Sequence, residues 1–481
     1  AHGLVQPRQP CAGIHPVIHR LGPVRHGHGF RRRQVDVAPD EPPNEAATAP
    51  VPAFIECDGP DPGLEGSDRV VAANVDPGHR IGIDTFVYSR YGNPTVKMFE
   101  QRLALLEGAE ACRATGTGMA AVFGALAYQL KSGDRVVASR ALFGACHAIL
   151  TKILPKWGVK TELIDGTDLA AWKAALATPA KLVFLESPSN PVLELVDIAA
   201  VCDLAHDAGA LVLVDNVFAS PLYQKPLELG ADIVIYSTTK HIDGQGRLLG
   251  GAVLGKASFV EDVFLPFYRQ TGAAISAFNA WVMLKSLETL PLRVAAQTEN
   301  AAHVASFLHN HPKVKSISYP GHESHPQHDL AKRQMSGFGN MLAFEIDGDQ
   351  AVAFRFLNAL ALIDISNNLG DSKSLACHPF TTTHANLSDA DRASLNITPS
   401  HIRLSVGLED KIFFIHQPFT SLFLNSLSIF FLTSNRTVLS PSICLPIKPP
   451  LYPPFPYLFF PQYRRPLPVV NILRPFLSCL I

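Results

Sequence analysis

The stretch IVIYSTTKH at residues 233–241 carries most of the information about the fold. Its apolar, largely β-branched beginning is typical of a buried strand in a parallel sheet. The hydroxyl residues and Lys240 that follow would then lie at the carboxyl end of the strand, where open α/β sheets bind ligands. Partial burial there lowers the pKa of a lysine and frees its amine to attack a carbonyl. Taken alone, Lys240 fits a solvated loop lysine better, so a catalytic assignment depends on its surroundings.

Size and charge limit the classes of protein. The chain has 481 residues, 47% of them hydrophobic, and a formal net charge of −1. This length predicts a large core and two domains, and the near-neutral charge gives no reason to expect a nucleic-acid or membrane partner. The eight cysteines form no C-x-x-C pair, which favours a reducing compartment such as the cytoplasm over a disulfide framework. No charged-then-apolar signal segment follows Ala1, so secretion has no support.

Composition divides the chain into three regions. Residues 1–83 are rich in proline, histidine and arginine and show little periodicity, which predicts low order. Residues 84–410 have globular composition. Residues 411–481 contain no Asp or Glu and are dominated by Phe, Leu, Pro and Ser. Three explanations of this tail stay open: a membrane segment, although its apolar run is shorter than about 20 residues; an aggregation-prone extension; and translation of a pyrimidine-rich non-coding tract, which we favour.

Strand and helix patterns alternate through the globular region. Apolar runs predict strands at 135–139, 160–164, 181–186, 211–214 and 233–235, and amphipathic patterns predict helices at 96–107, 118–130 and 197–208 and a further helix ending at 157. This alternation predicts a parallel sheet with right-handed crossovers. The carboxyl ends of its strands would bring together Phe143, Glu186, Asn190, Asp215 and Lys240.

A glycine-rich helix start lies upstream. In Thr115-Gly116-Thr117-Gly118-Met119, unpaired backbone N–H groups at the start of a helix would favour a phosphate. Ordinary helix capping by Thr115 or Thr117 explains the same pattern. The third glycine of a dinucleotide-binding fingerprint is absent. Phe143 likewise fits either a ring stacked on a flat ligand or a core phenylalanine.

Six motifs occur together in one order in this chain. They are YSRYGNPT at 88–95, TGMAA at 117–121, ESPSNP at 186–191, VDNVFA at 214–219, STTK at 237–240 and RLSVGLE at 403–409. In this order they resemble the cystathionine γ-synthase-like family of pyridoxal-phosphate enzymes, also called the Cys/Met metabolism family. The resemblance implies an α/β protein of PLP-dependent transferase fold type I. Its large domain, at 84–294, would contain a mostly parallel seven-stranded sheet, and a smaller C-terminal α/β domain would occupy 295–410.

The resemblance implies a role for each cofactor contact. Lys240 would hold pyridoxal phosphate as a Schiff base and later move protons, and Asp215 would pair with the pyridine nitrogen. The backbone amides of Gly118 and Met119, with Ser237 and Thr239, would bind the phosphate. Further cofactor contacts implied by the resemblance are Phe143 on the ring, Asn190 at the phenolic oxygen, Glu186 beside them, and Tyr88 and Arg90 reaching the phosphate from a neighbouring subunit of a homotetramer built from dimers.

The substrate side is implied in the same way. Arg403 would bind the substrate α-carboxylate, with Asn368 and Tyr88 nearby. LFGACH at 142–147 and SNNLGD at 366–371 are most similar to the O-succinylhomoserine sulfhydrylase branch. The expected reaction is γ-replacement on O-succinyl- or O-acetylhomoserine by sulfide, giving homocysteine. A cystathionine γ-synthase, a cystathionine or methionine γ-lyase, and a non-catalytic chain stay open. Scattered histidines are expected to be structural or to line the substrate site, and no metal is expected.

Overall fold

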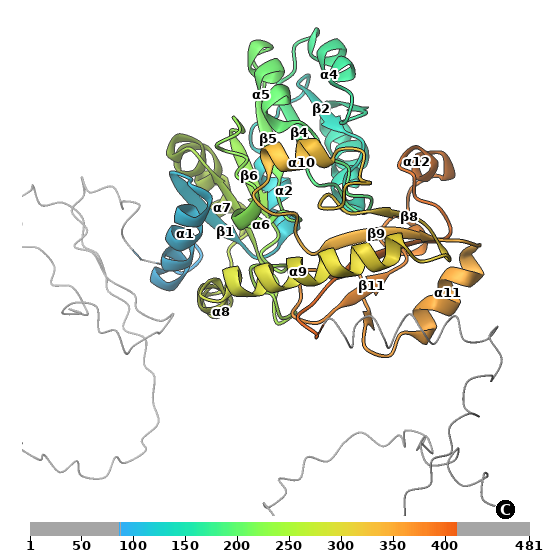
Figure 1. The fold of residues 1–481 in the computed structure, drawn as a ribbon. Coiled ribbons are helices and arrows are strands. Elements are labelled where there is room, and N and C mark those ends of the chain that lie inside the picture. The colour runs from blue at the N-terminus through green and yellow to red at the C-terminus, as the bar shows by residue number, and fades with distance from the viewer. Residues whose placement is uncertain (1–85, 87, 411–481) are drawn as a thin grey trace, which may run out of the picture. The chain divides into compact units, whose positions relative to one another are not determined.

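The computed structural model describes residue 86 and residues 88–410 (Figure 1). Segments 1–83 and 411–481, which composition sets apart, lie outside the described residues, so the predictions made for them stay predictions. None of the described helices is long and apolar enough to cross a membrane.

A seven-stranded sheet forms the first part of the fold. Its strands are β1 (Ala111–Thr115), β2 (Arg135–Ser139), β3 (Lys160–Ile164), β4 (Leu182–Glu186), β5 (Leu211–Asp215), β6 (Ile233–Tyr236) and β7 (Gly251–Gly255). They lie in the order β1-β7-β6-β5-β4-β2-β3. Strands β2 to β6 pair in parallel, and β7 runs antiparallel to both β6 and β1. The mostly parallel sheet is thus confirmed.

Two of these strands carry weak sequence signals. Strand β7 has the sequence GAVLG, with a glycine at each end, and β1 has the sequence ACRAT, with an arginine at its centre. Glycine is depleted in strands, and a central arginine interrupts an apolar run. The five predicted strands agree with β2 to β6 within a residue at each end.

Helices cover both faces of this sheet. The first are α1 (Pro94–Glu107), α2 (Gly118–Ala127), α3 (Gly144–Ala148), α4 (Leu169–Leu176), α5 (Ile198–Asp207) and α6 (Ser220–Tyr223). The single helix predicted to end at residue 157 is instead three short pieces: α3, the π-helix η1 (Ile149–Ile153) and the 3-10 helix η2 (Leu154–Trp157). Pro155 in η2 lacks the N–H that a continuing α-helix needs, which accounts for the break at this end.

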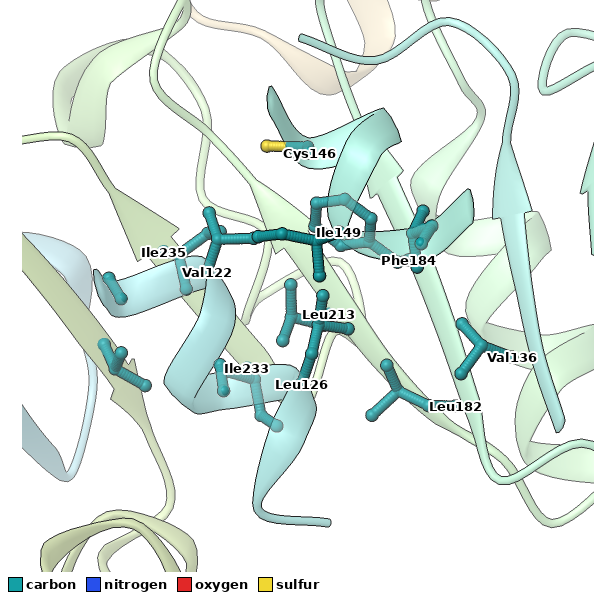
Figure 2. Packing of buried hydrophobic residues seen from close by; sticks show 14 of the residues in the cluster. Val122, Leu126, Val136, Cys146, Ile149, Leu182, Phe184, Leu213, Ile233 and Ile235 are labelled. Carbon is teal, nitrogen blue, oxygen red and sulfur yellow. The ribbon is translucent and has the colours of Figure 1, made fainter. Parts of the chain in front are cut away.

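Alternation along β4 and β5 builds a hydrophobic core on each face of the sheet. Phe184 on β4 and Leu213 on β5 are fully buried against Val122 and Leu126 of α2 (Figure 2). Their strand neighbours project to the opposite face, since successive strand residues alternate. There Val183, Leu185, Val212 and Val214 pack with Trp172 of α4 and with α5. A parallel sheet covered on both faces reads as continuous apolar runs, as these strands do.

A second, smaller sheet follows in the chain. Its order is β10-β11-β12-β9-β8, with β8 at Val314–Ser318, β9 at Met341–Ile346, β10 at Asp364–Ile365, β11 at Leu375–Cys377 and β12 at His401–Ser405. Helices α7 (Leu265–Thr271), α8 (Ala277–Leu287), α9 (Leu290–His309), α10 (His328–Gln334), α11 (Gln350–Ala359) and α12 (Asp389–Ser394) complete the described chain, with short pieces η3 (Ser258–Phe264) and η4 (Pro379–Thr381). This sheet agrees with the predicted smaller α/β domain. Helix α9 runs through residues 294 and 295, and the boundary there stays a prediction.

Candidate active site

A cavity of about 970 Å³ lies at the carboxyl ends of β4, β5 and β6. It is also lined by residues of the second sheet and its loops. The predicted site residues that line it are Gly118, Met119, Phe143, Glu186, Asn190, Asp215, Ser237, Thr239, Lys240, Asn368 and Arg403. Tyr88 and Arg90 are the predicted residues that do not. Residues scattered over nearly 290 positions of the chain therefore meet in one cavity.

Lys240 follows β6 in a turn and is partly buried. Its Nζ donates a hydrogen bond to Oδ1 of Asn368 at 2.7 Å. Burial and, to a smaller extent, the positive charge of Arg403 lower the pKa of Lys240 to about 8. A substantial fraction of the amine is therefore neutral just above neutral pH, as a nucleophile or a base requires.

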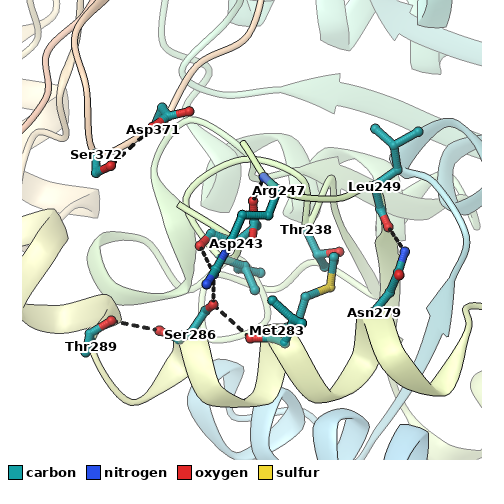
Figure 3. Close-up of polar contacts among 12 residues, drawn as sticks. Thr238, Asp243, Arg247, Leu249, Asn279, Met283, Ser286, Thr289, Asp371 and Ser372 are labelled. Carbon is teal, nitrogen blue, oxygen red and sulfur yellow. Dashed lines mark hydrogen bonds and ion pairs between the residues drawn. The ribbon is translucent and has the colours of Figure 1, made fainter. Parts of the chain in front are cut away.

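The turn that carries Lys240 is anchored on helix α8. Asp243 accepts a hydrogen bond from Nε of Arg247 at 3.0 Å, and Arg247 also bonds to Ser286 of α8 (Figure 3). Asn279 of the same helix donates to the carbonyl of Leu249 at 3.1 Å. Since Asp243 is fully buried and paired, this network fixes the backbone that follows Lys240.

Two carboxylates end neighbouring strands at the cavity. Glu186 is the last residue of β4 and Asp215 the last of β5, and they face each other in the sheet register. Burial raises the pKa of Asp215 to about 7, opposed by a hydrogen bond from the N–H of Val217 at 3.1 Å. Burial, and then the charge of Asp215, raise the pKa of Glu186 well above its usual range. A cationic ring nitrogen near Asp215 would relieve this repulsion.

Glu186 has a role that its strand-end position did not reveal. One carboxylate oxygen accepts from the backbone N–H of Phe143 and the other from that of Asn190, both at 2.8 Å. Glu186 therefore holds the two loops that carry Phe143 and Asn190. Sequence reasoning placed it beside these residues but had no signal for this bond pattern, because side chain to backbone contacts depend on loop geometry.

The start of α2 forms a close cradle with the turn after β6. A Cβ at Gly118 would lie 2.6 Å from Cβ of Ser237, so only glycine permits this approach. Thr117 caps the helix by accepting the N–H of Ala120 at 3.0 Å. The cap does not exclude an anion here, since the first N–H groups of a helix have no intrahelical partner and suit a phosphate. The hydroxyl of Thr239 accepts from the N–H of Gly250 at 3.0 Å and lines the same cavity.

Arg403 enters the cavity from β12 of the second sheet. Its Nη1 donates to Oδ1 of Asn190 at 3.0 Å, and its Nη2 donates to the carbonyls of Asn367 and Asn368 at 2.9 and 3.2 Å. Its Nε has no hydrogen-bond partner among the described residues. The side chain is only 2% exposed, so this N–H is poised for an anionic ligand.

Tyr88 and Arg90 lie together outside this cavity. The guanidinium of Arg90 stacks over the rings of Tyr88 and Tyr91 at 5.2 and 4.6 Å and donates to the carbonyl of Arg269. Tyr88 is 56% exposed. Within one chain the structure does not bring them to Lys240, and their contact with a neighbouring subunit's cofactor stays a prediction.

Two charged residues of the cavity lining, Lys152 and Arg247, were not predicted. His384 also lines the cavity. Burial lowers the pKa of His384 to about 4, and Arg403 adds to this shift, so the imidazole is neutral. His384 is thus one of the histidines expected to be structural or to line the substrate site, whereas no periodicity or motif marks Lys152 or Arg247.

The residues present fit pyridoxal phosphate. A nucleophilic amine, an anionic carboxyl at a strand end, a helix start whose glycine admits close backbone approach, and an arginine with an unpartnered N–H surround one cavity. These groups suit, in turn, an aldehyde, a pyridine nitrogen, a phosphate and a carboxylate. Within the described chain, no group of three or more His, Cys, Asp or Glu residues is arranged to hold a metal ion.

Comparison with known proteins agrees with this chemistry. Residues 71–413 match the family described as Cys/Met metabolism PLP-dependent enzyme. O-succinylhomoserine sulfhydrylase of Mycobacterium tuberculosis is 54% identical over 332 residues, covering 68% of this chain and 82% of that protein. The enzyme of the same name from Pseudomonas aeruginosa is 48% identical over 324 residues, with coverages of 67% and 80%.

More distant relatives share the fold. L-methionine gamma-lyase of Porphyromonas gingivalis is 40% identical over 329 residues, covering 68% of this chain and 82% of the lyase. The crystal structure of cystathionine gamma synthase from Xanthomonas oryzae pv. oryzae with cystathionine matches with a TM-score of 0.71 at 34% identity, covering 75% of this chain and 91% of that chain. The chain therefore belongs to the Cys/Met metabolism family of PLP-dependent enzymes.

Proposed function

We propose that the protein catalyses γ-replacement on an O-acylhomoserine: sulfide displaces the acyloxy group, and homocysteine forms for methionine biosynthesis. The observation that carries this proposal is the meeting of Lys240 and Arg403 at Asn368. The side chain of Asn368 accepts from the amine at 2.7 Å, and its carbonyl accepts from the guanidinium at 3.2 Å. A substrate whose carboxylate binds Arg403 would therefore present its Cα beside the amine of Lys240.

This geometry supports the following roles for the chain's own residues. Arg403 binds the α-carboxylate, and Asn368 can hold the Lys240 amine once the amino group of the substrate has displaced it from the cofactor. Lys240 then removes a proton from Cα, and a second proton leaves Cβ before the acyloxy group departs from Cγ; after sulfide adds at Cγ, protons return to Cβ and Cα. Pyridoxal phosphate, when bound, supplies the electron sink that makes these C–H bonds acidic. Asp215 keeps its ring nitrogen protonated, and Phe143 holds the ring face.

Phe143 favours replacement over elimination from a thioether. It lines the cavity but has no hydroxyl to donate a proton. An acyloxy group departs as a carboxylate, a weak base that needs no proton, whereas a thiolate leaving group benefits from a general acid. Cystathionine γ-synthase activity, with cysteine in place of sulfide, is the second candidate, because the fold is similar to that of a cystathionine gamma synthase solved with cystathionine. The third is a chain that binds cofactor without turnover.

Turnover of O-succinyl- and O-acetylhomoserine with sulfide or with cysteine separates these candidates. Formation of homocysteine with sulfide, and no product with cysteine, supports the proposal. Cystathionine formed with cysteine supports a synthase, and release of 2-oxobutyrate from methionine supports a lyase. A colourless preparation, with no borohydride-fixed cofactor on Lys240, would contradict all the catalytic assignments.

We further propose that the active form is a homotetramer built from dimers, located in the cytoplasm. The exposure of Tyr88 and the position of Arg90 outside their own cavity support a role in a neighbouring site. The four described cysteines are free, as in a reducing compartment.

Mixing two inactive variants tests the shared site. Arg90→Ala leaves Lys240 intact, and Lys240→Ala leaves Arg90 intact. A mixed dimer would contain one site with both residues, so refolding the two variants together is expected to restore sulfide-dependent turnover and cofactor colour. Each variant refolded with itself is the control. No recovery from mixtures that sedimentation shows to be hybrid would contradict the shared site.

A further inference from the structure

Four lysine or arginine side chains of the described chain line the cavity, and three are already committed. Lys240 donates to Asn368, and Arg403 is held by Asn190 and two backbone carbonyls. Arg247 is ion-paired with the fully buried Asp243 (Figure 3). The ammonium of Lys152 has no hydrogen bond or ion pair with any described residue. Besides the unpartnered Nε of Arg403, the Lys152 ammonium is therefore the cationic group of this cavity that remains available to a ligand.

Lys152 lies on the π-helix η1 and lines the cavity. His147 lies five positions earlier, in α3, which runs directly into η1. His147 and Ala148 also line the cavity. Burial lowers the pKa of His147, Asp391 opposes this shift, and the charge of Lys152 adds to it. The ammonium therefore lies close to the cavity wall.

Several small residues line the cavity on the stretch of chain from Phe143 to Lys152. Gly144, Ala145 and Ala148 are among its lining residues. Lys152 is exposed at the cavity rim, and its four-carbon stem lets the ammonium follow a ligand. The acidic residues among the described lining residues are Glu186 and Asp215, at the strand ends. A second carboxylate of the ligand would be repelled near Glu186 and Asp215 and attracted near Lys152.

We propose that Lys152 binds the distal carboxylate of a dicarboxylic acyl leaving group, so that the protein selects O-succinylhomoserine over O-acetylhomoserine. This inference rests on the proposed function. Arg403 would bind one end of the substrate and Lys152 the other, with the reacting Cγ between them. An acetyl group has no carboxylate to reach Lys152. Since the distal carboxylate takes no part in bond breaking, Lys152 acts on substrate binding and thus on KM rather than kcat.

Replacing Lys152 tests this assignment. Lys152→Met is expected to raise KM for O-succinylhomoserine about tenfold, the loss of one charge-assisted hydrogen bond. Its kcat, and the kcat/KM for O-acetylhomoserine, should stay unchanged. Lys152→Arg should restore most of the preference. Lys156→Met is the matched control, because Lys156 is exposed on the neighbouring η2 and does not line the cavity. An unchanged ratio of kcat/KM between the two substrates in Lys152→Met would overturn the proposal.

Direct binding separates this inference from the proposed function. Succinate, the leaving group itself, is titrated into the cofactor-loaded protein by calorimetry, with acetate as the comparison. Wild-type protein should bind succinate more tightly than acetate, and Lys152→Met should weaken succinate binding about tenfold. Binding with no turnover of either acylhomoserine would contradict the proposed function but keep the site. Turnover of O-succinylhomoserine with equal succinate binding by both proteins would contradict the site alone.

Discussion

Two pairs of acidic residues in the first sheet region, three of them buried and Glu261 partly buried, differ in which group neutralises their charge. Glu100 and Glu261 share Arg113, whose nitrogens lie 3.3 and 2.6 Å from their carboxylates. Glu186 and Asp215 face each other across neighbouring strands, and no ion pair joins either of them to a described residue. The first pair is complete within the chain.

The difference indicates which pair serves a ligand. Burial raises the pKa of Glu100 to about 7, but Arg113 and the N–H of Ala114 oppose this shift. At Asp215 only one N–H, from Val217, opposes burial. Leaving buried carboxylates without a cation is costly, and such pairs persist where a ligand supplies the missing charge. Under the proposed function, the pyridine nitrogen of the cofactor would supply that charge at Asp215.

Matched amide substitutions give the largest expected contrast. Asp215→Asn is expected to reduce turnover by about 10²-fold or more, because an amide does not keep the ring nitrogen protonated. In the cofactor-free protein it should raise Tm, because a buried charge without a partner is removed. Glu100→Gln should lower the free energy of unfolding by about 2 kcal/mol, because it weakens the pair with Arg113. Kinetics and thermal unfolding measure both.

Equal changes of Tm in Asp215→Asn and Glu100→Gln would contradict the view that Glu100 is neutralised within the chain and Asp215 is not. Loaded protein is the control, because bound cofactor supplies the cation. There Asp215→Asn should lose the stabilisation that cofactor gives the wild-type protein, whereas Glu100→Gln should retain it.

The cofactor half of this site follows from sequence more fully than the substrate half. Lys240 and Asp215 end apolar strands of a parallel sheet, so topology alone brings them to one edge. Arg403 comes from a strand of a different sheet, and only the resemblance to the family placed it in the site. Lys152 lies on a π-helix that periodicity predicted as part of a regular helix. Residues whose position depends on packing between elements distant in the sequence have no local pattern.

The pH dependence of stability tests, with a smaller expected effect, whether Asp215 lacks a cation in the cofactor-free protein. The pKa of Asp215 rises from an ordinary 3.8 to about 7 on folding, so the folded protein binds more protons than the unfolded chain between these values. The free energy of unfolding of the cofactor-free protein should therefore fall as pH rises from about 4 to 7, by at most about 1.4 kcal/mol per pH unit from this group.

Denaturant unfolding across this pH range, in wild-type protein and Asp215→Asn, isolates the contribution of Asp215. The variant should have the shallower pH dependence, and cofactor should flatten the slope of the wild-type protein. Parallel curves for the two cofactor-free proteins would show that Asp215 is already neutralised by the chain.

The smallest expected effect concerns the rate at which Lys240 reacts with the cofactor. Because its charged form is a cation, burial lowers its pKa, whereas burial raises the pKa of Asp215. Burial lowers the pKa of its amine to about 8, and Arg403 contributes to the shift. Attack on the cofactor aldehyde requires the neutral amine, so the rate of cofactor loading should rise with pH and level off above about 8.

Arg403→Met removes the neighbouring charge and should move the pH midpoint of cofactor loading upward, by less than the shift that burial causes. Lys285→Met, on the exposed side of α8, is the control and should leave it unchanged. Loading is followed by borohydride fixation and mass spectrometry, so catalysis is not needed. A midpoint that stays in place in Arg403→Met would mean that burial alone sets the reactivity of Lys240, and that the second sheet contributes substrate contacts without tuning the amine.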